Sequence, residues 1–389
     1  MVKFAHMADI HLGGWRHKEL QDLNFQSFQK ALNMCIDEKI DFLLIAGDLF
    51  DTAYPPIEIL KETFAEFRRL KDSGIPCFII SGSHDYSVSG KTFLEVLEKG
   101  GFCKNVTDFD ETEKGIILNP TIHNGVALYG FPGKKSGLDL KDLKKIKLKP
   151  SENKFKILML HTTIDKAVES LGNLPIDFVE ADSLPETDYC ALGHIHIRLQ
   201  YKQFVYPGPL FPNNFAELET LKHGSFCMID TNNEKPVKTI EIPIKKIESV
   251  YVTITDGLTA TDEIISKLKE RDLQDKIILL RISGELKNSK QSDIQFKKIE
   301  DFAKQNNAYF LLRNTHELKT EEVEFESELK DSENIEDDAV KVYLEKSPSS
   351  LDNLALLVIK SLSIEKGEGE TSESFSSRLI GETRKILEF

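Results

Sequence analysis

Short, uninterrupted apolar runs alternate along the chain with longer segments in which apolar residues recur every three or four positions. The runs predict buried strands, because strands covered on both faces are apolar throughout; they lie at 42–46, 77–80, 157–160 and 189–192. The periodic segments, around 24–38 and 57–72, predict amphipathic helices. The alternation predicts an α/β fold class with stacked sheets, outer helices and a functional site on the loops at the strand ends.

From about position 250 the pattern starts again with a second, smaller set of elements. Strands are predicted at 250–254, 277–282 and 309–312, with helices at 260–271 and 294–304 between them. This order of strand, helix, strand, helix and strand predicts a small α/β domain.

The C-terminal part begins with an acidic stretch at 317–338, where eleven acidic and two basic residues give a charge of −9 out of −14 for the whole chain. Such a charge run is typical of a solvated linker. Short amphipathic helices are predicted after it, at 339–346, 351–363 and 373–388. Their apolar stripes can pack on their own domain or lie in a groove of another protein, and composition slightly favours the first.

Composition limits the class of protein. A chain of 389 residues predicts two or three domains. No run of about 18 apolar residues and no N-terminal signal pattern is present, so we expect a cytoplasmic protein that does not bind membranes. The five scattered cysteines predict buried free thiols rather than disulfides or a zinc site.

Carboxylates and imidazoles gather directly after the predicted strands. A single histidine is more often a packing or surface residue than a metal ligand. The set is more informative, because two divalent ions about 3.5–4 Å apart can hold the attacking and leaving oxygens of a displacement at phosphorus. Asp48 is the natural bridge between them. The candidate residues are Asp9, His11, Asp48, His84, Asp85, His161, His194 and His196.

The spacing of these residues adds to the argument. Asp9 and His11 stand at alternate positions after a strand-like run, and both side chains leave on one side if the chain stays extended. His194 and His196 repeat that spacing. Glycines adjoin three of the motifs, where a backbone without a Cβ can turn sharply or approach an ion; they are Gly47, Gly82 and Gly193.

The motif series resembles the calcineurin-like metallophosphoesterases and, within them, the archaeal-type Mre-eleven/SbcD nucleases of double-strand-break repair. The motifs stand in family order over roughly residues 1–240; they are Ala8–Gly13, Ala46–Asp51, Gly82–Asp85, Leu160–His161, Leu192–His196 and Tyr206–Pro209. The resemblance implies a four-layer β-sandwich flanked by helices. It divides the chain into a nuclease domain at 1–245, a capping domain at 246–316, the acidic linker at 317–338 and a helical partner-docking segment at 339–389.

The resemblance also implies the ligands of two metal ions. One ion is assigned to Asp9, His11, Asp48 and His196, and the other to Asp48, His161, His194 and Ser83. The family usually has Asn at the position of Ser83, and a hydroxyl is a poorer ligand than an amide oxygen. We therefore expect a weaker second site, although Mn²⁺ tolerates mixed oxygen, nitrogen and water ligands.

The remaining candidates act on the substrate or the loops. By resemblance, His84 lies beside the scissile phosphate, where imidazole can stabilise charge or protonate the leaving oxygen. Asp85 orients His84 or its loop, and a turn or capping carboxylate is an equal alternative. His17, Lys134 and Lys135 are candidates for DNA contact, with a structural histidine and a solvated lysine loop as the simpler interpretations.

By resemblance, the chain is expected to be a nuclease with two Mn²⁺ ions, or Mg²⁺ in their place, that cleaves duplex and single-stranded DNA ends as a 3′-to-5′ exonuclease and single-strand endonuclease. By resemblance, the partner is a Rad-fifty/SbcC-type ATPase bound by the C-terminal helices. The resemblance also implies a homodimer, with 57–72 or 91–99 as candidate interface helices, although an apolar helix face can equally be buried within the monomer. Two alternatives remain open, which are a phosphatase or phosphodiesterase for small substrates and a DNA-end scaffold weakened by Ser83.

Overall fold

The computed structural model describes residues 2–320, apart from 88–90, 114, 134–142, 154, 173 and 288, together with a helix at 372–387. The chain forms two compact units, Met1–Glu321 and Glu322–Phe389. Within these described residues, no helix is both long and apolar enough to cross a membrane. All five cysteines are free, four of them buried and Cys103 half-buried, as the sequence predicted.

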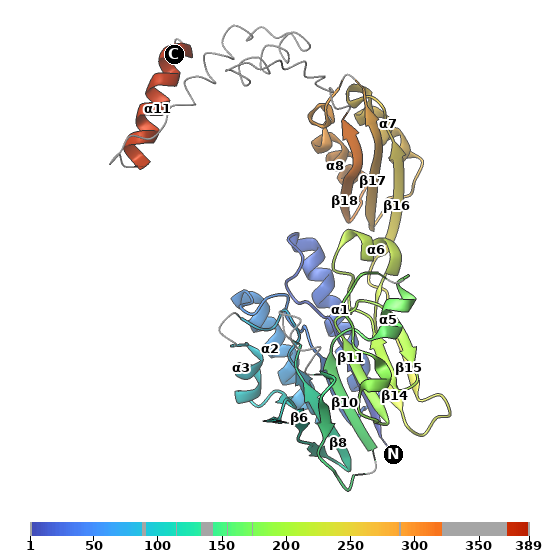
Figure 1. Ribbon diagram of the computed structural model, residues 1–389. Helices are drawn as coiled ribbons and strands as arrows, with labels where there is room; N and C mark the ends of the chain where they lie inside the picture. Colours follow the sequence, from blue (N-terminus) through green and yellow to red (C-terminus); the bar gives the residue numbers. More distant parts are fainter. Residues whose placement is uncertain are drawn as a thin grey trace. The chain divides into compact units, whose positions relative to one another are not determined.

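The first unit contains two six-stranded sheets (Figure 1). The first sheet has the order β15-β14-β1-β2-β3-β4, with β1 to β4 parallel and β14 and β15 antiparallel to their neighbours. Its strands are β1 Lys3–Met7, β2 Phe42–Ala46, β3 Cys77–Ile80, β4 Lys104–Asn105, β14 Gly224–Asp230 and β15 Val237–Ile242.

The second sheet has the order β12-β13-β11-β10-β8-β7, with parallel strands in the middle and antiparallel edges. Apolar side chains of both sheets, such as Phe4, Phe42 and Met159, form the buried cluster between them. The strands are β7 Thr121–His123, β8 Val126–Phe131, β10 Phe155–His161, β11 Tyr189–Gly193, β12 Arg198–Tyr201 and β13 Phe204–Pro207.

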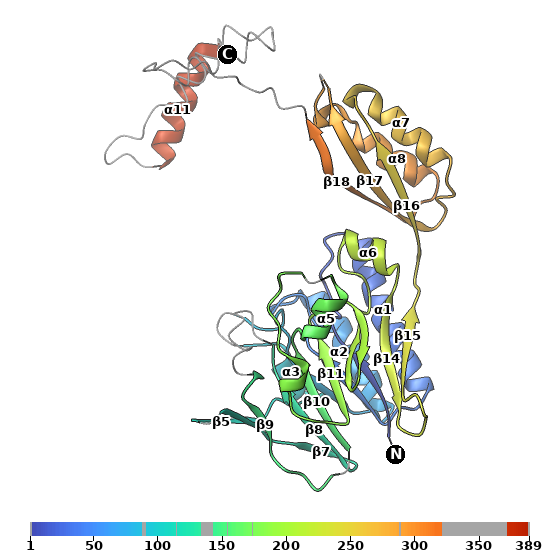
Figure 2. The ribbon, with the colours of Figure 1, turned by 45° about the vertical axis from the view of Figure 1, so that its right-hand side comes forward.

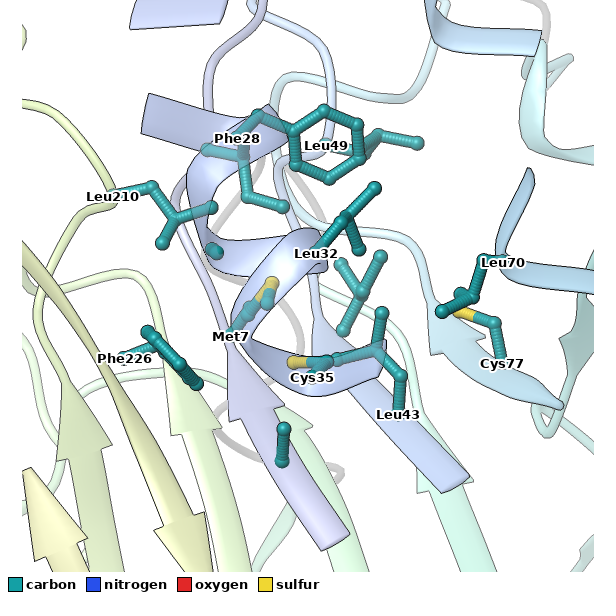
Figure 3. Packing of buried hydrophobic residues seen from close by; sticks show 14 of the residues in the cluster. Met7, Phe28, Leu32, Cys35, Leu43, Leu49, Leu70, Cys77, Leu210 and Phe226 are labelled. Atoms are coloured by element: carbon teal, nitrogen blue, oxygen red, sulfur yellow. The ribbon is translucent and has the colours of Figure 1, made fainter. Parts of the chain in front are cut away.

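Helices cover the outer face of the first sheet. They are α1 Lys18–Asp37, α2 Ile57–Asp72 and α3 Leu94–Lys99. Figure 3 shows Phe28, Leu32 and Cys35 of α1 packed over Met7 and Leu43 of the sheet. Helix α1 begins six residues before the expected start at 24, because its first turn, with Leu20, packs against the cap described below.

The outer face of the second sheet is covered by short elements. They are α5 Asp165–Ser170, the 3₁₀ turn Ala181–Ser183 and a small sheet of β5 Phe109–Thr112, β6 Gly115–Leu118 and β9 Ile146–Leu148. Ile116, Leu118 and Ala167 pack there against the strands. The four-layer metallophosphoesterase arrangement is thus confirmed, with a small sheet contributing to one outer layer.

Residues 246–320, which we call the cap, form a three-stranded parallel sheet with two helices on one face (Figure 2). Its order agrees with the predicted alternation, but the last strand continues to Thr320, past the expected end of the domain at 316. The elements are β16 Lys246–Thr253, α7 Gly257–Lys269, β17 Lys276–Leu286, the 3₁₀ turn Gln291–Asp293, α8 Phe296–Gln305 and β18 Phe310–Thr320.

A shared apolar cluster joins the base of the cap to the sandwich. The cap contributes Ile277 and Leu279 of β17, and the sandwich contributes Trp15 and Leu218. Leu218 belongs to a seven-residue helix, α6 Phe215–Leu221. Helix α6 therefore lies at the junction of the two parts.

The second unit contains α11, Ser372–Leu387. Phe375, Leu379 and Thr383 of this helix are partly buried, while Ile380 is exposed, which agrees with the predicted stripe at 373–388. The acidic stretch from 321 onward and the helices expected at 339–346 and 351–363 lie outside the described residues.

Candidate metal centre

The candidate residues meet at the carboxyl ends of the parallel strands. β1, β2 and β3 are neighbours in one sheet, and β10 and β11 are neighbours in the other. Parallel strands end at the same edge of a sheet, so the loops that follow them lie together. Asp9 follows β1, Asp48 follows β2, Ser83 and His84 follow β3, His161 ends β10, and His194 and His196 follow β11.

The expectation that Asp9 and His11 alternate along an extended strand is wrong. β1 ends at Met7, and both residues adopt left-handed backbone conformations, with φ of 52° and 47°. Asp48 shares this conformation, with φ of 52°. Its carbonyl accepts hydrogen bonds from the backbone N–H groups of Ile10 and His11 at 2.9 and 3.0 Å. The two loops therefore hold each other in the conformation that brings their side chains together.

Two glycines are required by close approach in this region. A Cβ on Gly47, whose φ is +88°, would lie 2.2 Å from Nδ1 of His161. A Cβ on Gly82 would lie 2.2 Å from Oδ1 of Asp48. The glycines noted in the sequence thus make room for the neighbouring site residues.

Asp9, His11 and His196 form one group whose potential ligand atoms all lie within 4.8 Å of one another. The Nε2 atoms of His11 and His196 are 3.2 Å apart, and Nε2 of His196 is 4.0 Å from Oδ1 of Asp9. These residues are three of the four ligands expected for the first ion.

Asp9, Asp48 and His161 form a second such group. Nε2 of His161 lies 3.1 Å from Oδ2 of Asp48, and the same oxygen is 3.7 Å from Nε2 of His11. Asp48 therefore lies between the imidazoles of the two groups, where a bridging carboxylate would stand. A third group combines His11 and Asp48 with His84, although His84 was expected not to be a ligand.

Four imidazoles of the site use the same ring nitrogen, Nδ1, for a hydrogen bond to the protein. Each has Nδ1 within hydrogen-bond distance of an oxygen, which fixes the proton there and turns Nε2 toward the centre or the solvent. The pairs are His11 with Oδ1 of Asp51 at 3.2 Å, His84 with the carbonyl of Asp51 at 2.8 Å, His161 with the carbonyl of Ala46 at 2.9 Å and His196 with Oε1 of Glu217 at 2.9 Å.

The donor set fits divalent cations, since imidazole and carboxylate are both common ligands of such ions. Oδ2 of Asp9 is buried without a hydrogen-bond partner among the described residues. A buried polar atom without a partner is costly, and a cation would remove that cost.

The electrostatics of the protein without ions point the same way. Burial favours the neutral form of His161, but Asp48 and Asp9 outweigh it and raise its pKa to about 10. Burial likewise opposes charge on His196, but Glu217 and Asp9 raise its pKa to about 9. The pKa of Asp48 is lowered, because His161 and His11 outweigh the effect of burial. Protons thus provide the positive charge that a metal ion would replace on binding.

Ser83 and His194, the other residues expected at the second ion, lie beside the second group. Oγ of Ser83 is 3.5 Å from Oδ2 of Asp48. The backbone N–H of His194 donates to Oδ1 of Asp9 at 2.8 Å, and its ring centroid is 5.1 Å from that of His161. Burial lowers the pKa of His194, with a further contribution from His161. Its imidazole is outside the three compact groups.

His84 and Asp85 have different surroundings. The side chain of His84 is 44% exposed and packs edge-on against His11. Asp85 is buried, and its carboxylate accepts hydrogen bonds from the backbone N–H groups of Phe50 and Gly82 at 3.1 and 2.9 Å. Burial and Asp48 raise the pKa of Asp85 to about 6. Asp85 therefore ties two site loops together, which agrees with the loop-orienting alternative.

The other candidates lie apart from this cluster or outside the described residues. His17 precedes α1, and its ring packs 4.7 Å from that of Phe310 in the cap. Lys134 and Lys135 lie outside the described residues. His6 is a fully buried core histidine with Nδ1 2.9 Å from the hydroxyl of Tyr189.

Sequence reasoning missed Asp51 and Glu217, which fix the orientation of His11 and His196. Asp51 is the last residue of a recognised motif, so its position was visible but its contact was not. Glu217 stands three residues after Asn214, the spacing of a capped helix start, and Asn214 does accept a hydrogen bond from its N–H. That spacing predicts a helix but not a contact with a histidine 21 residues earlier.

Comparison with known proteins decides the family. The family model described as calcineurin-like phosphoesterase matches residues 2–198, which include every assigned ligand. The chain belongs to the calcineurin-like phosphoesterase family. The resemblance inferred from the motifs is therefore confirmed.

Several archaeal proteins named DNA double-strand break repair protein Mre11 are similar to this calcineurin-like phosphoesterase. The protein of Aeropyrum pernix is 29% identical over 273 residues, which cover 66% of this chain and 65% of that protein. That of Archaeoglobus fulgidus is 25% identical over 338 residues, covering 77% and 74%. That of Methanocaldococcus jannaschii is 27% identical over 309 residues, covering 74% and 78%. The chain thus spans just under two thirds of the first relative's length and more of the other two.

Proposed function

We propose that this calcineurin-like phosphoesterase is a Mn²⁺-dependent DNA nuclease that processes broken DNA ends in double-strand-break repair, as a 3′-to-5′ exonuclease and single-strand endonuclease. The carrying observation is the convergence of Asp9, Asp48 and three imidazoles on one small volume, with Nδ1 of each imidazole already bonded to an oxygen. The similarity to archaeal repair proteins supports DNA as the substrate.

The residues divide the work between two ion sites. Asp9, His11 and His196 would hold one ion, and His161, His194 and Ser83 the other, with Asp48 between them. Two bound divalent ions would supply the positive charge that neutralises a phosphodiester and the acidity that makes an attacking water nucleophilic. Nδ1 of His11, His161 and His196 is turned to an oxygen. Nε2 is therefore the nitrogen of each ring that is available to bind a metal ion.

His84 is suited to act on the substrate itself. Its Nδ1–H donates to the carbonyl of Asp51, which leaves Nε2 as the free nitrogen of a half-exposed ring. At the rim of the site, the imidazolium form, which carries a proton on both nitrogens, can donate its Nε2 proton to the leaving oxygen or a hydrogen bond to the phosphate. Asp51 also contacts His11, so one residue positions both the metal ligand and the substrate-facing histidine.

The partners are proposed on similarity and on exposed surfaces. We assign the cytoplasm as the location. We assign α11 as the docking element for a Rad-fifty/SbcC-type ATPase by similarity, since this helix places Phe375 and Leu379 on one face and leaves Ile380 55% exposed. A homodimer would form through α2 and α3, where Ile57 and Val96 are 77% and 49% exposed.

Cleavage of end-labelled duplex and single-stranded DNA with Mn²⁺ tests the proposal. We expect cleavage by the wild type, its loss in His84→Ala, and a gain in Ser83→Asn, because an amide oxygen is a better ligand than a hydroxyl. A wild type without activity that recovers in Ser83→Asn would identify a disabled nuclease. Absence of DNA cleavage in all three, with hydrolysis of a small phosphodiester by the wild type, would overturn the choice of substrate.

A further inference from the structure

Helix α6 lies between the metal centre and the cap and contacts both. Residues two positions apart on a helix point in nearly opposite directions, since each residue turns the helix by about 100°. Glu217 and Glu219 have this spacing. Glu217 contacts His196 at the metal centre, and Glu219 contacts Arg281 on strand β17 of the cap.

The contact on the metal side is supported by further hydrogen bonds. Oε1 of Glu217 lies 2.9 Å from Nδ1 of His196 and accepts a further hydrogen bond from the Asn214 side chain at 2.6 Å. Oε2 accepts the backbone N–H of Asn213 at 2.9 Å. The carboxylate therefore has a fixed direction, and it fixes the ring of His196 in turn.

The contacts on the cap side involve Phe215 and Glu219 of α6 and Lys222, the residue that follows the helix. Oε2 of Glu219 is 2.6 Å from Arg281, and Oε1 accepts the hydroxyl of Tyr251 at 3.0 Å. The guanidinium of Arg281 also lies 5.2 Å from the ring centre of Phe215. Nζ of Lys222 is 3.2 Å from a hydroxyl of β16. Strands β16 and β17 of the cap are therefore both fastened to α6.

Buried side chains hold α6 against both sides. Leu218, between the two glutamates, is fully buried in the cluster that joins cap and sandwich. The side chains of Glu217 and Glu219 are each only 17% exposed. A displacement of the cap that carries α6 with it would therefore also move the carboxylate that holds His196.

We propose that α6 is a mechanical link in which Glu217 positions His196 and Glu219 anchors the helix to the cap, so that the affinity of one metal ion depends on the cap contact. The inference rests on the proposed two-metal function. It assigns to the cap a role in setting up the metal centre, and to Glu217 the role of a positioning residue.

Binding of Mn²⁺ alone to the full chain tests this link, with free Mn²⁺ followed by electron paramagnetic resonance and heat by calorimetry. Loss of a hydrogen-bond partner of a metal-binding histidine typically weakens metal binding about 10- to 100-fold, so Glu217→Gln should weaken one of the two ions by that factor. Glu219→Gln and Arg281→Gln should weaken the same ion about 2- to 30-fold. The variant that combines Glu219→Gln with Arg281→Gln should weaken binding by less than the product of the two single effects, because both changes break the same ion pair.

A matched control is Arg313→Gln, which removes an ion pair with Glu300 within the cap. It should leave both Mn²⁺ constants at their wild-type values. Thermal unfolding of each variant shows whether the fold is intact. Where it is intact, the dissociation constant of the second Mn²⁺ ion should stay unchanged, which marks the effect on the first ion as local.

Two outcomes would overturn the proposal in distinguishable ways. If the wild type binds two Mn²⁺ ions and either Glu217→Gln or Glu219→Gln retains both constants, the link is refuted while the nuclease proposal stands. If the wild type binds no Mn²⁺, the two-metal function fails and the link fails with it.

Discussion

Protonation of His6 should destabilise the sandwich in mild acid. His6 lies in β1, fully buried between the two sheets, with its Nδ1 2.9 Å from the hydroxyl of Tyr189 on the opposite sheet. Burial lowers its pKa from 6.5 to about 3. The unfolded chain therefore takes up this proton first as the pH falls, and the stability that the neutral histidine contributes is complete above pH 6.5 and lost between 6.5 and about 3.

The size of the effect follows from the two pKa values. One pKa unit corresponds to about 1.4 kcal/mol, so lowering the pH from 7 to 5 should remove about 2 kcal/mol of the free energy of unfolding through His6 alone. In His6→Gln, which cannot take up this proton, that part of the loss should be absent. The difference between wild type and variant should therefore shrink by about 2 kcal/mol over this range.

Urea unfolding at pH 5, 6, 7, 8 and 9 measures this difference, with the fluorescence of the single tryptophan, Trp15, as one probe and circular dichroism as another. Between pH 8 and 9 the histidine is neutral in both states, so the difference between the two proteins should be constant there. Equal losses of stability from pH 7 to pH 5 in wild type and His6→Gln would refute the reasoning.

Three further changes test the architecture of the centre. Gly82→Ala would place a Cβ 2.2 Å from Oδ1 of Asp48, so it should lower the thermal midpoint and abolish Mn²⁺ binding in calorimetry; unchanged binding would contradict the close approach. Asp85→Ala leaves the buried N–H of Phe50 without its acceptor and should cost about 1–3 kcal/mol in urea unfolding, whereas a cost near zero would mean that the loops do not need this tie. Mn²⁺ at about 100 times its dissociation constant should add about 2.7 kcal/mol to the free energy of unfolding of the wild type by mass action. Scanning calorimetry should show that a chelator reverses this gain and that Asp48→Ala lacks it.

Periodicity predicted the interior of the fold well, because the spacing of apolar residues along a strand or helix reflects which of its faces are buried. The runs at 42–46 and 77–80 are strands β2 and β3, and the segment at 57–72 is helix α2. The boundaries at the cap were less well predicted. The first turn of α1 and the last residues of β18 depend on tertiary contacts and a continuing strand, which a local pattern does not contain.

The candidate site was predicted in its residue types but not in its geometry. Motif order identified Asp9, His11 and Asp48, yet the backbone conformation that unites them depends on hydrogen bonds between loops far apart in the sequence. For the same reason the contact of Glu217 with His196 was not foreseen, since it needs α6 to return to the site after β13.

The left-handed backbone conformations at Asp9, His11 and Asp48 mean that selection for stability and selection for activity favour different residues there. A residue with a Cβ is destabilised by roughly 1–2 kcal/mol in this region, whereas glycine is not. Glycine at these three positions would relieve the backbone while deleting the groups proposed to bind metal. Directed evolution for heat resistance alone should therefore drift toward an inert protein at these sites, and any stabilised library of this enzyme must be screened for metal binding as well as for melting temperature.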